Sequence, residues 1–331
     1  MSSRPSLRLS GALTLTTALL VGCGSSGSDS SSTAEETRVY AADNGKIKIP
    51  VKPERVVATG YAVPVLIEAK ASLVGISTWD RGLAMMAKDD LATYNKLKKV
   101  AGAMAAETNY EAIASVKPDL IVIGVPKPVL ADIDLKRLET IAPVVAIGPT
   151  VPSAWRELSE RQSDAAGRLD DFEKGRKTYE KKASELTAKY ATALNGVEFG
   201  HVGGYGDIAK GTFQREFGSS WGTNIAQDIG VKYPGEVAQK GGGALDVTEF
   251  PSIEKLPQSL GTADAITYSV EDDGSVSEAV QYVLDSKLWK NLPAVKAGKV
   301  YPLKYTEAAT YTSAVKTLDA VDEALAPLLK P

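Results

Sequence analysis

A proline-free segment, residues 153–194, divides this chain into two parts and limits the folds open to it. The segment is dense in Glu, Lys, Arg, Ala and Leu, with apolar residues at helical intervals. Opposite charges four residues apart, such as Glu157 and Arg161, are typical of solvated helix faces. We therefore expect a long helical connection made of one or two helices, with a break near residues 167–171.

The sequence on each side of this connection alternates between strand and helix patterns. Short runs rich in Val and Ile, separated by apolar residues at helical spacing, predict parallel strands with helices on both faces. The expected fold class is α/β, with two doubly wound lobes joined by the long rigid helix and a ligand cleft between them. We expect strands at 53–60, 72–79, 118–124, 143–148, 197–204, 263–270 and the end of 295–304. We expect helices at 61–71, 109–117, 135–142, 223–230, from 252 onward and at 312–329, and a hairpin that turns at 43–45.

The first 37 residues have a different character from the rest. Arg4 and Arg8 precede an uncharged apolar run, residues 11–22, which is typical of a secretory signal peptide and too short to span a membrane. The boundary LVGC resembles a bacterial lipobox, so Cys23 is the expected lipid attachment site, and a free thiol is the alternative. The expected division is a signal peptide (1–22), lipidated cysteine and flexible tether (23–37), N-terminal lobe (38–152), helical connection (153–194) and C-terminal lobe (195–331).

Composition excludes several kinds of site. A single cysteine cannot form an internal disulfide or a CxxC motif, and a single histidine, His201, excludes a His-rich zinc or copper site. The formal net charge is −3, and the chain has no basic stripe of the kind that binds nucleic acids. We therefore expect no intrinsic cofactor, no metal held by protein ligands and no nucleic-acid partner.

Two enzyme-like motifs are chance matches in our interpretation. Residues 218–222 fit GxSxG around Ser220, but a nucleophile elbow needs a histidine downstream, and the one histidine lies upstream. Residues 204–209 fit GxGxxA, but a dinucleotide fingerprint needs a helix directly after it, and later glycines interrupt any such helix. A hydrolase that uses Ser220 is the alternative from another functional class.

Aromatic residues make up only 7% of the chain, yet several fall in loops at the ends of predicted strands. Open α/β sheets bind ligands outside the carboxyl ends of their strands, so loops that present Trp, Tyr and Arg there indicate a ligand cleft. The candidate ligand-binding residues are Trp79, Arg81, Tyr205, Arg215, Trp221, Tyr268 and Tyr305. The weaker candidates are Tyr61, Pro126, Trp155 and Tyr311.

Several segments of the chain match a known family. They are PERVV (53–57), LVGI (73–76), NYEAI (109–113) running on to KPDLI (117–121), IAPVV (141–145) and SIEKL (252–256). The pattern resembles the substrate-binding lipoproteins of ABC importers in which a rigid helix joins two α/β lobes. Members of that class bind ferric siderophores, cobalamin or haem. The greatest likeness is to actinomycete lipoproteins that take up ferric hydroxamates, including ferrioxamines.

The resemblance implies a binding protein rather than an enzyme. It would capture a ferric siderophore and deliver it to an ABC permease and its ATPase. Glu111 and Glu254 match the acids that dock onto permease arginines in the family, and ordinary carboxylates at helix N-termini are the alternative. We expect a monomer on the extracytoplasmic face, held at the membrane by its lipid anchor alone. Because a helical connection resists hinge closure, the lobe shifts should be small.

The residue types favour a hydroxamate ligand. A ferric catecholate is strongly anionic and would need a cluster of Arg and Lys, and haem usually takes a protein axial ligand. A ferric trihydroxamate is neutral at its iron, so Arg81 and Arg215 can donate to its oxygens while aromatic rings cover its linkers. A pendant amine can rest against a ring face, and the iron arrives fully chelated. A cobalamin or haem receptor, and a surface lipoprotein without ligand, remain as alternatives.

Overall fold

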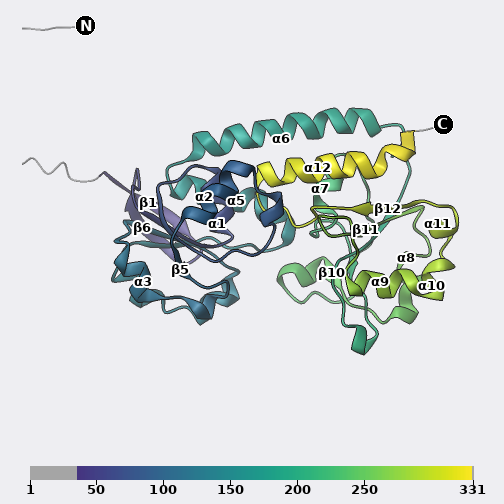
Figure 1. Ribbon diagram of the computed structural model, residues 1–331, viewed down its shortest axis with the longest axis horizontal. Helices are drawn as coiled ribbons and strands as arrows, with labels where there is room; N and C mark the ends of the chain where they lie inside the picture. Colours follow the sequence, from purple (N-terminus) through teal and green to yellow (C-terminus); the bar gives the residue numbers. More distant parts are fainter. Residues whose placement is uncertain (1–35, 330–331) are drawn as a thin grey trace, which may run out of the picture. The chain divides into compact units, whose positions relative to one another are not determined.

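The computed structural model describes residues 36–329 of the chain (Figure 1). The predicted signal peptide, the predicted lipidation site Cys23 and nearly all of the predicted tether lie outside the described residues. Two five-stranded sheets and one hairpin contain the strands of the described part. None of its helices is both long and apolar enough to cross a membrane.

The first sheet has five parallel strands in the order β5-β4-β3-β6-β7. Leu120 and Val122 of β6 pack into one apolar cluster, whereas Ile121 and Ile123 pack into another. Successive side chains of a strand point to opposite faces, so helices on both faces require the continuous apolar run seen in the sequence. The strands are β3 (Val56–Gly60), β4 (Leu73–Ser77), β5 (Lys99–Ala101), β6 (Leu120–Gly124) and β7 (Val144–Ala146).

Side-chain caps begin two of the helices that follow these strands. Asn109 accepts a hydrogen bond from the backbone N–H of Ala112 at 2.9 Å. Asp134 accepts one from the backbone N–H of Arg137 at 3.1 Å. Such caps satisfy backbone donors that the first helical turn leaves unpaired. The helices of this part are α1 (Ala62–Glu68), α2 (Lys88–Lys96), α3 (Tyr110–Ser115) and α4 (Leu135–Glu139).

The predicted hairpin is confirmed. Strand β1 (Thr37–Ala42) pairs antiparallel with β2 (Gly45–Pro50), and the turn lies between them. Two turn residues, Asp43 and Asn44, donate hydrogen bonds to backbone carbonyls of β7 at 2.8 and 3.0 Å. The hairpin therefore attaches to the edge of the first sheet.

The predicted helical connection consists of two helices, α5 (Trp155–Ala165) and α6 (Leu169–Tyr190). Gly167 lies between them with a φ of 65°, in the left-handed region that glycine adopts most readily. A side chain there would also meet the backbone oxygen of Val51, since a Cβ at this position would lie 2.9 Å from it. The break follows from this backbone geometry.

The closing helix α12 (Tyr311–Leu325) runs beside α6 (Figure 1). The Lys189 ammonium lies 2.6 Å from the carboxylate of Asp322 in α12. The Tyr190 hydroxyl donates a hydrogen bond to the backbone carbonyl of Asp322 at 2.8 Å. The long helix of the connection is therefore tied to the helix that ends the fold.

The second sheet has the order β10-β9-β8-β11-β12. Its β8, β11 and β12 are parallel, but β9 and β10 add an antiparallel edge that the sequence does not predict. These two strands have two residues each, too few to produce a periodic signal. The strands are β8 (Phe199–Val202), β9 (Arg215–Glu216), β10 (Thr248–Glu249), β11 (Ala265–Ser269) and β12 (Val300–Leu303). The helices are α7 (Asn224–Gln227), α8 (Leu256–Leu260), α9 (Glu278–Asp285), α10 (Lys287–Lys290) and α11 (Pro293–Lys296).

Candidate functional site

Loops at the carboxyl ends of strands from both sheets line a pocket of about 570 Å³. These loops follow β4 in the first sheet and β8, β11 and β12 in the second. Open α/β sheets bind ligands at this end of their strands, and the volume is usual for a small-molecule site. We call it the strand-end pocket. Its lining comprises residues 80–85, 204–205, 216, 221, 269–272, 277 and 305–307.

Three aromatic rings stand together beside this pocket. The ring of Tyr61 meets that of Trp79 edge-on, with centroids 5.0 Å apart. It lies nearly parallel to the ring of Trp221, with centroids 6.1 Å apart and an angle of 6° between the planes. Tyr61 and Trp79 follow strands of the first sheet, whereas Trp221 follows β9 of the second. Tyr61, a weaker candidate from the sequence, therefore links the two predicted tryptophans.

Arg81 lines the strand-end pocket and contacts the same rings. Its Nη1 donates a hydrogen bond to the Tyr61 hydroxyl at 2.7 Å, and its guanidinium carbon lies 5.9 Å from the Trp221 ring centre. Its Nε lies 3.9 Å from a carboxylate oxygen of Glu307. A guanidinium carries five N–H donors, and these contacts engage only two of its nitrogens. The rest can bind oxygens of a ligand.

Two tyrosines lie along the open side of the pocket. Tyr205 is 52% exposed and donates a hydrogen bond to Oε1 of Glu307 at 2.5 Å. Burial and the neighbouring Glu307 carboxylate raise the pKa of Tyr205 to about 12, so its hydroxyl remains a donor at neutral pH. Tyr305 lines the pocket with a φ of 58°, a conformation that is uncommon for residues other than glycine. Such backbone conformations concentrate at ligand sites.

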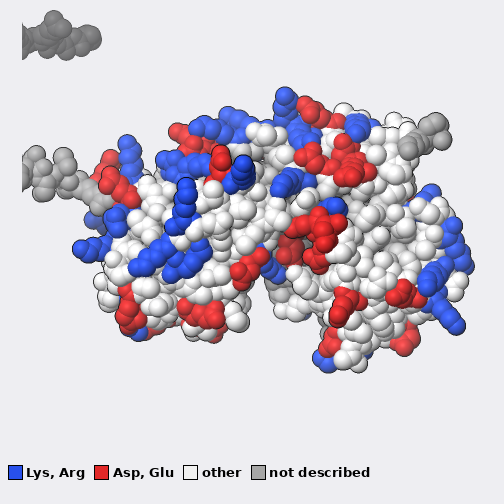
Figure 2. Space-filling model, viewed as in Figure 1, with Lys and Arg blue, Asp and Glu red and all other residues white. Residues whose placement is uncertain are grey.

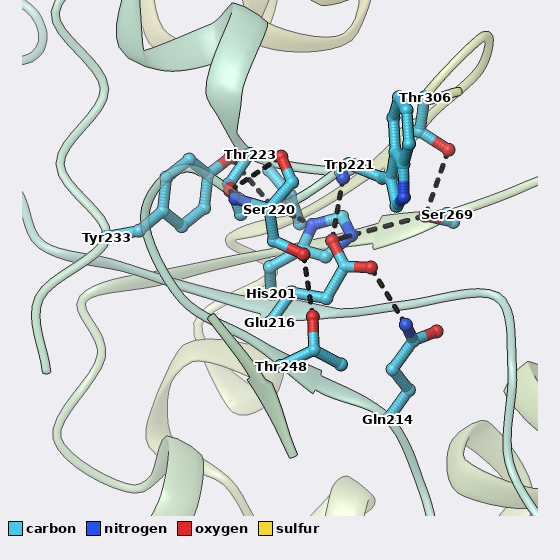
Figure 3. Close-up of polar contacts among 12 residues, drawn as sticks. His201, Gln214, Glu216, Ser220, Trp221, Thr223, Tyr233, Thr248, Ser269 and Thr306 are labelled. Atoms are coloured by element: carbon cyan, nitrogen blue, oxygen red, sulfur yellow. Dashed lines mark hydrogen bonds and ion pairs between the residues drawn. The ribbon is translucent and has the colours of Figure 1, made fainter. Parts of the chain in front are cut away.

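A buried carboxyl group forms part of the pocket floor, below Trp221 (Figure 3). Glu216 is 3% exposed and accepts hydrogen bonds from the backbone N–H of Gly222 at 2.6 Å and from Nε2 of Gln214 at 3.0 Å. Its Oε2 also lies 3.7 Å from Nε2 of His201. A Cβ at position 222 would lie 2.0 Å from that nitrogen. Only glycine fits there without displacing the network.

Both ring nitrogens of His201 lie within hydrogen-bonding distance of hydroxyl groups (Figure 3). Nδ1 lies 2.8 Å from Oγ1 of Thr267, and Nε2 lies 3.2 Å from Oγ of Ser269. Ser269 in turn donates to Oγ1 of Thr306 at 3.3 Å. Ser269 and Thr306 line the pocket, so this network connects the buried histidine to the ligand space.

The buried pair titrates far from its ordinary pH range. Burial, with a smaller effect of the Arg215 charge, lowers the pKa of His201 to about 3. Burial raises the pKa of Glu216 to about 7. Between about pH 3 and 7 the 3.7 Å contact therefore joins two uncharged groups and is not an ion pair.

The structure does not bring Arg215 to the strand-end pocket. Its side chain is 4% exposed, and its Nη1 donates to the backbone carbonyls of His201 and Glu216 at 3.3 and 2.5 Å. It lines a separate pocket of about 660 Å³ with Phe217, over whose ring the guanidinium lies at 4.6 Å. Adjacent strand residues face opposite sides, and in β9 the neighbour Glu216 faces the strand-end pocket.

Tyr268 also lies away from the strand-end pocket, for the same reason. Its ring packs edge-on against Trp289, with centroids 6.2 Å apart. The next residue of β11, Ser269, lines the pocket instead. The sequence locates this strand end correctly but does not tell which of two neighbours faces the ligand space.

Three weaker candidates are also elsewhere. Trp155 and Tyr311 are 1% and 6% exposed and pack against each other at 4.8 Å, where α5 and α12 begin. The indole N–H of Trp155 donates to Asn224 at 2.9 Å, so this residue holds helices together. Pro126 lies after β6, before a short 3-10 helix, and is absent from the pocket lining.

The two predicted docking glutamates are exposed. Glu111 lies in the first turn of α3, its side chain is 77% exposed, and it forms an ion pair with Arg137. Glu254 lies in a 3-10 helix, Ile253–Lys255, and interacts with the hydroxyl of Ser252. Both can reach a partner, although Arg137 would have to release Glu111 first.

Comparison with known proteins identifies the family. No protein-family model matches the chain. It is 27% identical over 287 residues to the iron(3+)-hydroxamate-binding protein YxeB of Bacillus subtilis, covering 85% of this chain and 82% of that protein. It is 30% identical over 306 residues to the iron(3+)-hydroxamate-binding protein FhuD of the same organism, covering 86% of each. The chain belongs to the siderophore-binding proteins of ABC importers.

A solved structure of a siderophore-binding protein supports the assignment. The siderophore periplasmic binding protein from the fuscachelin gene cluster of Thermobifida fusca has 29% sequence identity and a TM-score of 0.66. The match covers 84% of this chain and 98% of that one. The predicted family and the predicted two-lobed α/β class are both confirmed.

Membership of the siderophore-binding family also decides the question of enzymatic activity. The relatives are binding proteins, so the hydrolase alternative built on Ser220 is set aside. Ser220 is fully buried, and its hydroxyl lies 2.7 Å from that of Thr248. The motif at residues 204–209 runs into a three-residue 3-10 helix, Ile208–Lys210, rather than the α-helix of a dinucleotide site. Residues 36–329 contain no group of three or more His, Cys, Asp or Glu placed to hold a metal ion.

Sequence reasoning missed eight polar residues of this siderophore-binding protein's pocket. They are Asp80, Glu216, Ser269, Glu271, Asp272, Ser277, Thr306 and Glu307. All but Glu271, Asp272 and Ser277 lie within two positions of a predicted residue, at the end of a strand or just beyond it. The available signal was therefore the strand end itself, and every polar side chain within two positions of it was a candidate.

Proposed function

We propose that this protein captures a ferric hydroxamate siderophore of the ferrioxamine type in the strand-end pocket. The observation that carries the proposal is Arg81, a single half-exposed guanidinium that contacts the parallel rings of Tyr61 and Trp221 at the pocket. The hydroxamate specificity of the relatives YxeB and FhuD supports the same ligand class.

The chemistry of the pocket suits such a ligand. A ferric trihydroxamate has a neutral centre whose oxygens carry partial negative charge, so one guanidinium can donate to them without a large charge mismatch. Trp221 and Tyr305 offer apolar surface for the methylene linkers between the hydroxamates. The siderophore occupies every coordination position of the iron, so the protein binds the chelate by its outer surface.

Delivery to a permease completes the proposed function. Exposed charges on the two halves, Glu111 and Glu254, would orient the protein on arginines of the permease, and a lipid at Cys23 would keep it at the extracytoplasmic membrane face. Reversing both charges together, Glu111→Lys with Glu254→Lys, should abolish iron uptake in cells and leave siderophore affinity unchanged. The control is Asp285→Lys, an exposed acid outside both segments. Wild-type uptake by the double variant would rule out this docking.

Intrinsic fluorescence tests the ligand directly, because Trp221 lines the pocket and Trp79 packs against Tyr61 beside it. Ferrioxamine B should quench the emission saturably at micromolar concentration or below, whereas the iron-free chelator should bind far more weakly. Ferrichrome, a ferric catecholate, haem and cobalamin serve as comparisons. If ferrioxamine B gives no saturable quenching while haem or cobalamin does, the proposed ligand class is wrong.

A further inference from the structure

The strand-end pocket carries an excess of acidic side chains. Five acidic residues line it and only one basic residue, Arg81. The acids are Asp80, Glu216, Glu271, Asp272 and Glu307. A pocket with more acidic than basic groups attracts cations and repels anions, because opposite charges lower the free energy of binding and like charges raise it.

Two of the three basic groups near the pocket, Arg81 and Lys316, already have internal partners. Arg81 donates to Tyr61 and lies beside Glu307, as described above. Lys316 donates to the backbone carbonyl of Ala84 at 2.6 Å, and Lys304 lies next to the loop that contains Gly274. Glu216 adds little negative charge, because burial raises its pKa to about 7. Even with both lysines counted, the other four acids outnumber the three bases.

Two of the acids stand open at the end of β11. Glu271 and Asp272 are exposed, and neither side chain has a hydrogen bond or an ion pair with any of residues 36–329. Glu307 differs, because it accepts from Tyr205 and contacts Arg81. Figure 2 shows acidic side chains gathered near the middle of the visible face of the molecule. A cationic group on a ligand would find Glu271 and Asp272 without displacing an internal partner.

We propose that these acids select ferric hydroxamates that carry a positive charge at their periphery, and that Glu271 and Asp272 receive the ligand's ammonium group. This inference rests on the proposed function. In the bound complex Arg81 faces the hydroxamate oxygens, and the ammonium lies toward the carboxylates beyond β11. Neutral chelates with the same iron centre bind less well, and anionic ones bind least.

The size of the selection follows from the exposure of these carboxylates. An exposed ion pair strengthens binding about 1.4- to 5-fold, so two acids acting on one ammonium give a preference of roughly 2- to 30-fold. Because the attraction is screened by salt, the preference should shrink as ionic strength rises. The affinity of a neutral chelate should change little over the same range.

Three ligands with one iron centre isolate the effect. Ferrioxamine B carries a terminal ammonium, its N-acetyl derivative is neutral there, and its N-succinyl derivative ends in a carboxylate. Calorimetric titration at low salt should rank their affinities in that order, with about three- to tenfold between neighbours. The joint variant Glu271→Gln with Asp272→Asn should bring the three affinities together. Asp285→Asn, an exposed acid outside the pocket lining, should keep the wild-type ranking.

The outcomes separate the inference from the proposed function. If wild type binds all three chelates with equal affinity, charge selection is refuted while hydroxamate binding stands. If the ranking holds in wild type but survives in the joint variant, Glu271 and Asp272 are not the residues that select. If none of the three binds, the proposed function fails and the inference fails with it.

Discussion

The phenol ring of Tyr61 lies parallel to the indole ring of Trp221, with their centroids 6.1 Å apart. Tyr61 follows β3 of the first sheet and Trp221 follows β9 of the second, so this contact joins the two sheets at the pocket. The Tyr61 hydroxyl also accepts the hydrogen bond from Arg81. One stacked pair thus positions both the apolar wall and the guanidinium.

Removing one ring of this pair should weaken siderophore binding. Trp221→Ala should lower the affinity for ferrioxamine B about tenfold, because a ligand-facing aromatic surface contributes on the order of 1–2 kcal/mol. Trp221→Phe keeps an aromatic surface and should lose much less. Calorimetry measures both affinities, and equal binding by the alanine variant and wild type would remove Trp221 from the site.

The two predicted arginines should behave in opposite ways. Arg81→Ala should weaken ferrioxamine B binding about tenfold, because it removes a charge-assisted donor worth roughly 1.5 kcal/mol, and should leave the melting temperature nearly unchanged. Arg215→Ala should lower the free energy of unfolding by about 2 kcal/mol, because two buried carbonyls lose their donor. The affinity of the folded Arg215 variant should equal that of wild type. A loss of affinity at Arg215 without a loss of stability would contradict this assignment.

The buried pair Glu216 and His201 makes the stability depend on pH in two opposing ways. The pKa of Glu216 rises from 4.5 to about 7 on folding, so its contribution to the free energy of unfolding is complete below pH 4.5 and is lost as the pH rises through 7. The pKa of His201 falls from 6.5 to about 3 on folding, so its contribution to the free energy of unfolding is complete above pH 6.5 and is lost as the pH falls from 6.5 towards 3. Between pH 4.5 and 6.5 the two effects oppose each other, and the wild type should change little.

Replacing the carboxyl group by an amide exposes one of these effects. In Glu216→Gln only His201 titrates, so the free energy of unfolding should rise with pH relative to wild type, by about 3 kcal/mol between pH 4.5 and 7. Urea unfolding at several pH values measures the difference. The exposed variant Glu278→Gln should follow wild type throughout. A constant offset between Glu216→Gln and wild type would show that Glu216 has no displaced pKa.

Glu68 should stabilise the closing helix from the first half of the chain. This carboxylate ends α1 and accepts hydrogen bonds from the backbone N–H of Thr312, in the first turn of α12, at 3.1 and 3.3 Å. Glu68→Ala should lower the free energy of unfolding by about 1–2 kcal/mol, because it removes the acceptor of the Thr312 N–H and a favourable charge at a helix N-terminus. Glu68→Gln keeps an acceptor and should lose less. Urea unfolding decides, and equal stability of Glu68→Ala and wild type would contradict the role.

The sequence predicts where strands end more reliably than which residue there faces the ligand. Arg81 and Trp221 line the pocket, and Trp79 packs against Tyr61 beside it. Each of the three stands in a loop, where no alternation applies. Arg215 and Tyr268 lie within strands, and there a shift of one residue exchanges the two faces of the sheet. No periodic signal in such short strands fixes that choice.

The elements that the sequence missed are short or polar. Strands β5, β9 and β10 have two or three residues, and six of the nine residues of α2 are polar. The partner of a buried carboxyl group such as Glu216 depends on contacts between residues distant in sequence, His201 among them. Such contacts exist only once the sheet has formed, so local patterns do not contain them.

The most direct test of the account is a calorimetric titration of ferrioxamine B into wild type and into the double variant Arg81→Ala with Trp221→Ala. We expect saturable one-to-one binding by wild type and a loss of about ten- to hundredfold in the double variant, because the two side chains contact each other and their effects need not add. Thermal unfolding of both proteins should be similar. If the double variant binds ferrioxamine B as tightly as wild type does, the siderophore does not bind in the strand-end pocket.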